Sequence, residues 1–147
     1  MNALHFAADK NNIDILNLLL QQPGIKIGTS CFKGCKNLTE IEIPSSITIL
    51  GDNAFSGCIS LHKITIPPHI TEIGKNCFEK CSSLREIAIP LTVTKIGRNA
   101  FNGCSSLLRI KIPNGITILD NFIFSGCSHL TKVEIPDSVT TFGNGVF

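Results

Sequence analysis

The chain has 147 residues, of which 43% are hydrophobic and 16% charged, and its formal net charge is +2. This length allows one ordinary domain, and the composition excludes an intrinsically disordered chain. So small a charge gives no indication of binding to nucleic acid or to an anionic membrane. No apolar run approaches the roughly 18 residues of a membrane span, and Asp9, Lys10 and Asp14 interrupt the pattern expected of a secretion signal. The sequence alone therefore favours a cytoplasmic location.

The first thirty residues have the apolar spacing of two short helices. Asn11-Asn12 separates them, and Pro23-Gly24 ends the second. The segment Leu4-His5-x-Ala7-Ala8, followed by a leucine-rich helix, resembles one ankyrin repeat. Since one such unit cannot bury its own apolar face, we expect residues 1–27 to cap the N-terminal end of residues 28–147. The alternative is that they are the last of several ankyrin repeats. We expect His5 to hydrogen-bond its own turn rather than to act in catalysis.

From residue 28 onward a strict period of 23 residues governs the sequence. Five units are close to F-x-x-C-x-x-L-x-x-I-x-I-P-x-x-[IV]-T-x-[LIF]-G-x-x-A. The phenylalanine column consists of Phe32, Phe55, Phe78, Phe101, Phe124 and Phe147. The proline column consists of Pro44, Pro67, Pro90, Pro113 and Pro136. Five copies in phase, without one insertion, identify the chain as a repeat protein.

Each unit predicts two short extended segments. Leu84, Ile87 and Ile89 end in period-2 alternation, which is typical of a strand, and Pro90 marks the end of that strand. A second alternation around Thr94 predicts another extended segment on the opposite side of the coil. Gly51, Gly74, Gly97 and Gly143 then provide a turn, for which we expect positive φ. Asp120 replaces glycine in the fourth unit, and Asp tolerates that conformation better than most residues.

A single unit cannot fold alone. About six large apolar side chains contribute on the order of 12 kcal/mol, whereas ordering 23 residues costs roughly 1–2 kcal/mol each. Stacked units share their backbone ladder and apolar edges, so the sequence predicts a solenoid with strands about 4.8 Å apart. Phe147 begins a sixth unit. We therefore expect either a longer parent chain or end-to-end self-association through the C-terminal edge.

The L-x-x-I-x-I core resembles a leucine-rich repeat, and the phrase C-S-S-L…I-P-x-x-[IV]-T-x-I-G-x-x-A-F resembles the BspA-like subclass. The resemblance covers residues 31–147 and implies a right-handed solenoid, and we expect residues 28–147 to form five repeats and the start of a sixth. It also implies protein binding, and adhesion at the surface of bacteria or protists, where some members bind host or matrix proteins.

The cysteine column consists of Cys35, Cys58, Cys81, Cys104 and Cys127. Stacking places these thiols close enough for disulfides, but five in a row leave one unpaired. A straight file does not supply four converging metal ligands, and no His or Asp column completes Cys31-x3-Cys35 or Cys77-x3-Cys81. We expect buried free thiols, with partial disulfides and a metal site as the alternatives.

No catalytic, cofactor-binding or metal site is predicted. The four histidines occupy different phases of the repeat, and no glycine-rich phosphate loop, HExxH or G-x-S-x-G motif occurs.

Residues between the inward columns point outward from the strands, and we predict that they form a protein-binding face. One file is Glu40, Lys63, Glu86, Arg109 and Lys132; a second is Glu42, Thr65, Ala88, Lys111 and Glu134; a third is Thr39, His62, Arg85, Leu108 and Thr131. The first file nearly alternates in sign, so neighbouring strands can pair their charges. A self-neutralised solvated face is the alternative interpretation. We expect Arg85, Arg109 and Lys111 to form its most basic patch.

The sequence thus predicts a non-enzymatic module that binds proteins, either as the surface adhesion protein that the resemblance implies or as an intracellular scaffold that combines ankyrin and leucine-rich repeats. A hydrolase that uses one cysteine is a third hypothesis, and the reactivity of the thiols distinguishes it.

Overall fold

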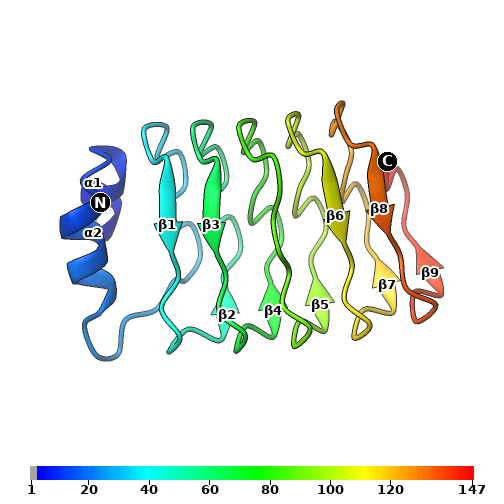
Figure 1. Cartoon of the computed structure of the whole chain (residues 1–147), viewed down its shortest axis with the longest axis horizontal. Helices are drawn as coiled ribbons and strands as arrows, with labels where there is room; N and C mark the ends of the chain where they lie inside the picture. The colour runs from blue at the N-terminus through cyan, green and yellow to red at the C-terminus, as the bar shows by residue number, and fades with distance from the viewer. Residues whose placement is uncertain (1–2) are drawn as a thin grey trace.

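The computed structural model describes residues 3–147. It is a right-handed solenoid in which each 23-residue unit forms one coil, and a pair of helices lies at its N-terminal end (Figure 1). The C-terminus lies at the opposite end of the long axis. The fold predicted from the repeat is therefore confirmed.

Two short helices precede the coils, as the apolar spacing predicted. Helix α1 spans Ala3–Asp9 and helix α2 spans Ile13–Leu20. Asn11 between them has a φ of 51°, and the side chain of Asn12 caps α2 by accepting a hydrogen bond from the backbone N–H of Ile15 at 3.1 Å. The first two residues of the predicted N-terminal unit lie outside the described part of the chain. The role of that unit as a cap stays a prediction.

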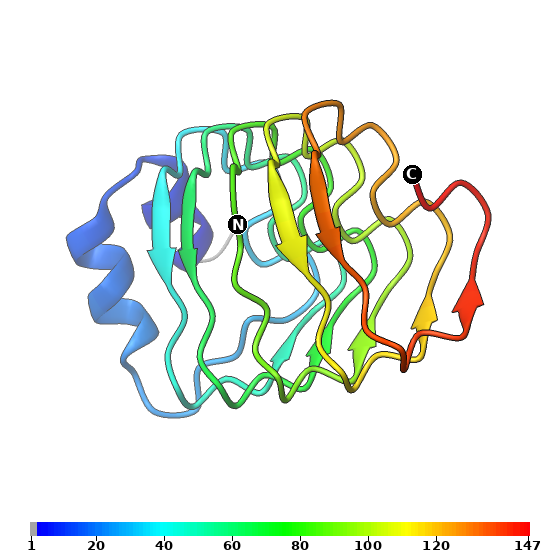
Figure 2. The same cartoon turned by 45° about the vertical axis from the view of Figure 1, so that its right-hand side comes forward.

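The strands form two rows along the solenoid, which Figure 2 shows from a second angle. The first row contains β1 (Glu40–Glu42), β3 (Lys63–Thr65), β6 (Arg109–Lys111) and β8 (Lys132–Glu134). The second row contains β2 (Ile49–Leu50), β4 (Glu72–Ile73), β5 (Lys95–Ile96), β7 (Ile118–Leu119) and β9 (Thr141–Phe142). The two extended segments expected in each unit account for the two rows.

Neighbouring coils pair in parallel, each residue opposite its equivalent one repeat away. Glu40 is opposite Lys63 and Arg109 is opposite Lys132. The first row is interrupted at residues 86–88, where only an isolated bridge between Glu86 and Arg109 joins the coil to its neighbour. The row therefore consists of β1 with β3 and β6 with β8, separated by a coil whose ladder is incomplete.

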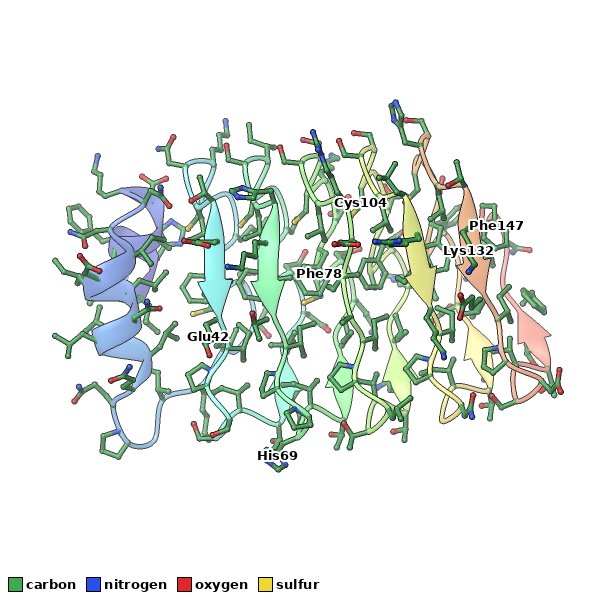
Figure 3. All side chains as sticks on the ribbon, viewed as in Figure 1. Glu42, His69, Phe78, Cys104, Lys132 and Phe147 are labelled. Atoms are coloured by element: carbon green, nitrogen blue, oxygen red, sulfur yellow. The ribbon has the colours of Figure 1, made fainter. Side chains whose placement is uncertain are left out.

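A stack of phenylalanine rings fills the centre of the solenoid. Successive rings of the phenylalanine column have centroids 5.2 to 5.8 Å apart and are nearly parallel. Figure 3 shows Phe78 among the side chains of its coil. The leucine column lies beside the rings, and Leu84 is fully buried. The inward columns predicted from the repeat are thus the core.

The prolines and glycines of the repeat have different structural roles. Each proline carbonyl accepts a hydrogen bond from the N–H three residues later, as Pro90 does from Val93 at 3.1 Å, so proline both ends the strand and begins a turn. The expectation of positive φ for Gly51, Gly74, Gly97 and Gly143 is wrong, and Asp120 does not adopt positive φ either. These glycines are needed because the preceding coil passes too close for a side chain: a Cβ on Gly74 would lie 2.6 Å from the backbone N of Asp52.

Positive φ occurs instead at two other positions of the repeat. One is the column of Ser30, Asn53, Asn76, Asn99, Phe122 and Gly145, in which asparagine is the commonest residue; the other contains mainly glycine, such as Gly57. Asparagine tolerates this conformation better than most side-chain-bearing residues. The left-handed residues therefore lie in the turn before and after the phenylalanine.

Gly74→Ala tests the close approach. We expect it to lower the free energy of unfolding by more than about 2 kcal/mol, because the neighbouring backbone would have to shift. The matched control is Gly28→Ala, since a Cβ there meets nothing within 4 Å and φ is not positive; that change should be nearly neutral. Urea denaturation measures both, and equal effects would contradict the packing explanation.

Leu84→Asp tests the core. A carboxylate at this fully buried position has no partner, so we expect the free energy of unfolding to fall by more than about 3 kcal/mol. Thermal denaturation followed by circular dichroism measures the loss. A melting temperature close to that of the wild type would show that Leu84 does not face the interior.

Candidate functional site

The outward residues of the first row of strands form one surface, here called the strand face, which runs from α2 to β8 (Figure 1). Of the residues predicted for it, all are exposed except Thr39 and Glu40, which are half-buried. Glu42 lies on β1 and Lys132 on β8, at opposite ends of this face (Figure 3). The structure thus brings the three predicted files together on one side of the solenoid.

A groove of about 690 Å³ occupies the middle of the strand face. We call it the central groove, and its polar lining consists of His62, Lys63, Thr65, Glu86, Arg109, Lys111, Lys132 and Glu134. Its apolar lining consists of the exposed Ala88, the half-buried Ile64, and Ile87 and Ile110, which are buried beneath the groove. The sequence did not predict a role for these isoleucines here, because they belong to the inward columns.

Charged side chains on the strand face pair across neighbouring coils, as the alternating file predicted. Arg109 donates hydrogen bonds from Nε and Nη2 to Oε2 of Glu86, at 3.0 and 2.6 Å. Lys63 lies 3.5 Å from Glu40. The Arg109 and Glu86 side chains are 69% and 65% exposed, so such pairs contribute little to stability.

Glu134 is shared by two lysines. Lys132 Nζ lies 2.7 Å from Oε1 of Glu134 on the same strand, and Lys111 Nζ lies 3.9 Å from its Oε2. The hydrogen bond and the charge of Lys132 lower the pKa of Glu134 below its ordinary value. Glu134 therefore stays ionised at neutral pH, between two cations.

The basic patch on this face differs in part from the one expected. Arg109 and Lys111 line the central groove together with Lys132, whereas Arg85 is exposed but lies outside the groove. Arg85 belongs to the third file, with Leu108 and Thr131. Of that file, only His62 contributes to the lining of the groove.

Hydrogen bonds join the helices to the first coil. They involve Thr39, which was predicted for the strand face, and two asparagines for which no such contact was predicted. Asn11 Oδ1 accepts hydrogen bonds from the backbone N and from Oγ1 of Thr39, at 3.1 and 3.2 Å. Asn37 Nδ2 donates to the carbonyl of Asp9 at 2.9 Å. His5 Nδ1 lies 3.4 Å from the carbonyl oxygen of Cys31, so the contact crosses to the first coil and is not confined to its own turn.

A second, smaller hollow of about 180 Å³ lies between α2 and the first strands, lined in part by Ile13, Asn17, Glu40 and Glu42. The strand face therefore continues onto α2, which the sequence could not indicate because the docking angle of the helices is not encoded in the repeat. The strand face is acidic at the end near α2, where Glu40 and Glu42 lie, and basic in the central groove.

The family model described as a BspA type leucine rich repeat region matches residues 12–147 in six copies. The chain belongs to this family. The match begins at the start of α2 and so includes part of the segment that resembles an ankyrin repeat.

Solved structures of bacterial leucine-rich repeat proteins share the fold. The T. pallidum protein TpLRR has 29% sequence identity and a TM-score of 0.71, over 84% of this chain and 70% of that protein. A leucine rich cell surface protein of Faecalibacterium prausnitzii has 30% identity and a TM-score of 0.60, over 82% of this chain and 41% of that protein. The pneumococcal vaccine antigen PcpA, at 22% identity and a TM-score of 0.65 over 78% of this chain and 33% of the antigen, shows the fold alone.

This BspA-type chain thus spans less than half of the last two proteins. No curated protein matches it.

The cysteines of the BspA-type repeat are free thiols, as expected, and Cys35, Cys58, Cys77, Cys81 and Cys104 are buried. The column thiols have a specific structural partner: Cys81 donates its S–H to the carbonyl of Phe55 in the preceding coil at 3.1 Å, and Cys104 does the same to Phe78. Figure 3 shows Cys104 within its coil. The thiol thus adds one more bond to the junction between coils.

Within residues 3–147, no group of three or more His, Cys, Asp or Glu side chains is arranged to hold a metal ion. Neither of the two described helices is long and apolar enough to cross a membrane.

Burial sets the reactivity of the thiols. Desolvation raises the pKa of Cys58 to about 12 and that of Cys127 to about 11. Because only the thiolate reacts, we expect native labelling at pH 8 to begin at the partly exposed Cys31 and Cys127. The buried thiols should react on the order of a thousandfold more slowly than free cysteine. Mass spectrometry of the labelled protein measures the order. A buried column cysteine that reacted fast would instead support the hydrolase hypothesis.

Proposed function

We propose that this BspA-type chain is a non-enzymatic module that binds other proteins through its strand face. The observation that supports the proposal most directly is the central groove, in which apolar surface of Ile64 and Ala88 lies among charged side chains. Binding surfaces combine a desolvated apolar centre with a polar rim, and solenoids commonly present such extended surfaces. The proposed contact residues are those of the three files of the strand face.

Adhesion at a cell surface is the setting that one relative favours. The Faecalibacterium prausnitzii protein, 30% identical to this chain, is described as a cell surface protein. The partners in that case would be host or matrix proteins. Fractionation of the source cells with an antibody to the chain tests the setting, since surface exposure distinguishes adhesion from the alternative.

An intracellular scaffold or adaptor is the second candidate. Helices α1 and α2 support it, because their sequence resembles an ankyrin repeat and they make hydrogen-bonded contact with the first coil through Asn11 and Asn37. In this case the helix pair caps the solenoid, and the hollow between α2 and β1 extends the binding face.

End-to-end self-association through the C-terminal edge stays a prediction. Phe147 stacks on Phe124 at 5.8 Å and is 65% exposed. Sedimentation velocity over a range of concentrations tests it.

Arg109→Glu tests the strand face. We expect it to reduce capture of a specific partner from extracts of the source cells at least tenfold while leaving the melting temperature almost unchanged, because Arg109 is exposed and its pair with Glu86 is weak. Quantitative pull-down and circular dichroism measure the two effects.

The matched control is Arg98→Glu, which makes the same change in charge at an exposed position that does not line the groove. Capture that survives Arg109→Glu, or that Arg98→Glu reduces equally, would show that the strand face is not the contact surface. Unfolding by Arg109→Glu would refute the assignment of this residue to the surface.

A further inference from the structure

The alternation of charge along the strand face fails at one place. In the first file, Glu40 lies opposite Lys63 and Glu86 opposite Arg109, so each of these steps joins opposite charges. The next step places Arg109 directly opposite Lys132. Like charges at directly opposite positions of paired strands are destabilising, so the fold alone does not favour this pair.

The neighbouring carboxylates only partly neutralise this step. Arg109 binds one oxygen of Glu86, and Lys132 binds Glu134, which Lys111 also approaches. Both hydrogen bonds from Arg109 to Glu86 come from Nε and Nη2, which leaves Nη1 for a further acceptor. All three cations are at least 66% exposed, so an incoming carboxylate competes with pairs that are individually weak.

The central groove as a whole has an excess of positive charge. Its lining contains four cationic side chains (Lys63, Arg109, Lys111 and Lys132) and two carboxylates (Glu86 and Glu134), a formal excess of two. The groove extends from β3 to β8, three coil spacings, which is roughly 14 Å. An extended segment of about four residues covers that length.

We propose that the central groove binds an extended acidic segment of a protein partner, with one carboxylate of that segment between Arg109 and Lys132. The proposal rests on the protein-binding function proposed above and specifies the chemistry of the partner. Arg109 is well suited to the contact, because a guanidinium has several donors in one plane and holds one carboxylate while it binds another. The apolar surface of Ile64 and Ala88 accommodates the aliphatic parts of the segment.

The same lining argues against a nucleic acid as the occupant. Glu86 and Glu134 stand among the cations, at 2.6 and 2.7 Å from Arg109 and Lys132. A dense row of phosphates would pass next to these carboxylates, and the repulsion would oppose binding. A polypeptide with spaced acidic side chains avoids them. Among the described residues, no aromatic side chain other than the imidazole of His62 lines the groove, so bases have little surface on which to stack.

The test begins without an identified partner. Random 12-residue peptides displayed on phage are selected against the immobilised chain, and the recovered peptides are synthesised with a fluorophore. Fluorescence anisotropy then measures their dissociation constants, with poly-L-glutamate as a defined probe, at low and high sodium chloride. We expect the recovered peptides to be enriched in Asp and Glu, and their affinity to fall as salt rises.

The decisive variant is Lys132→Glu. It places a carboxylate opposite Arg109 but removes the pair with Glu134, and both pairs are exposed, so we expect a melting temperature close to that of the wild type together with at least a tenfold weaker affinity for the acidic peptide. Lys132→Gln, which removes the charge without reversing it, should weaken binding less, and it replaces the first variant if that one fails to fold. Arg98→Glu is the control with the same change in charge, and its affinity should stay within about twofold.

The outcomes separate this proposal from the function on which it rests. Selected peptides that are not acidic but lose affinity in Lys132→Glu would overturn the acidic partner and leave the protein-binding face standing. Peptides whose affinity neither Lys132→Glu nor Arg109→Glu changes would overturn both. If Arg98→Glu lost as much peptide affinity as Lys132→Glu, binding would depend only on the net charge of the chain. That result would overturn the groove as the site. Tighter binding of heparin or single-stranded DNA than of the peptides would overturn the acidic polypeptide as occupant.

Discussion

The backbone of each coil obtains its hydrogen bonds mainly from the coils on either side. Phe55 N–H donates to the carbonyl of Cys77, and Phe78 N–H to that of Ala100, both at 2.8 Å. Because these bonds join each coil to the next at equivalent positions, every inward column must keep the same phase. A single insertion would place each later side chain out of register with its neighbour, which accounts for the absence of insertions over five units.

The cysteine and glycine columns result from the same constraint. Cys81 occupies a buried position beside the phenylalanine stack, where a small side chain fits and where its S–H reaches a carbonyl of the preceding coil. Gly74 occurs where two coils come so close that no Cβ fits. Both columns are therefore explained by the close spacing of the coils, and neither requires a metal or a reactive nucleophile to explain it.

The 23-residue period was sufficient to predict the solenoid, the two rows of strands and the inward columns, and the apolar spacing of the first thirty residues was sufficient to predict the helix pair. The period was insufficient where the residue type at one position of the repeat has two physical explanations. A glycine in a turn indicates positive φ or a close contact, and Gly74 needs the second. It was also insufficient where contact depends on how elements dock. Thr39 belongs to an outward file, yet Asn11 binds it, because the helix pair lies over the first coil.

The groove was less accessible to prediction than the face that contains it. Sequence places Arg109 and Lys132 one repeat apart and so makes them neighbours, but only the structure shows that the ladder is incomplete at residues 86–88 and that Arg85 lies outside the hollow. Residues that violate a local rule without a structural gain mark functional positions more often than others do. The Arg109–Lys132 step departs from the rule that opposite charges face each other, although Lys132 pairs with Glu134 on its own strand. A carboxylate at position 132 would pair with Arg109 but would stand beside Glu134 on its own strand, whereas the lysine pairs with Glu134 and leaves an excess of positive charge that a partner of this face can neutralise.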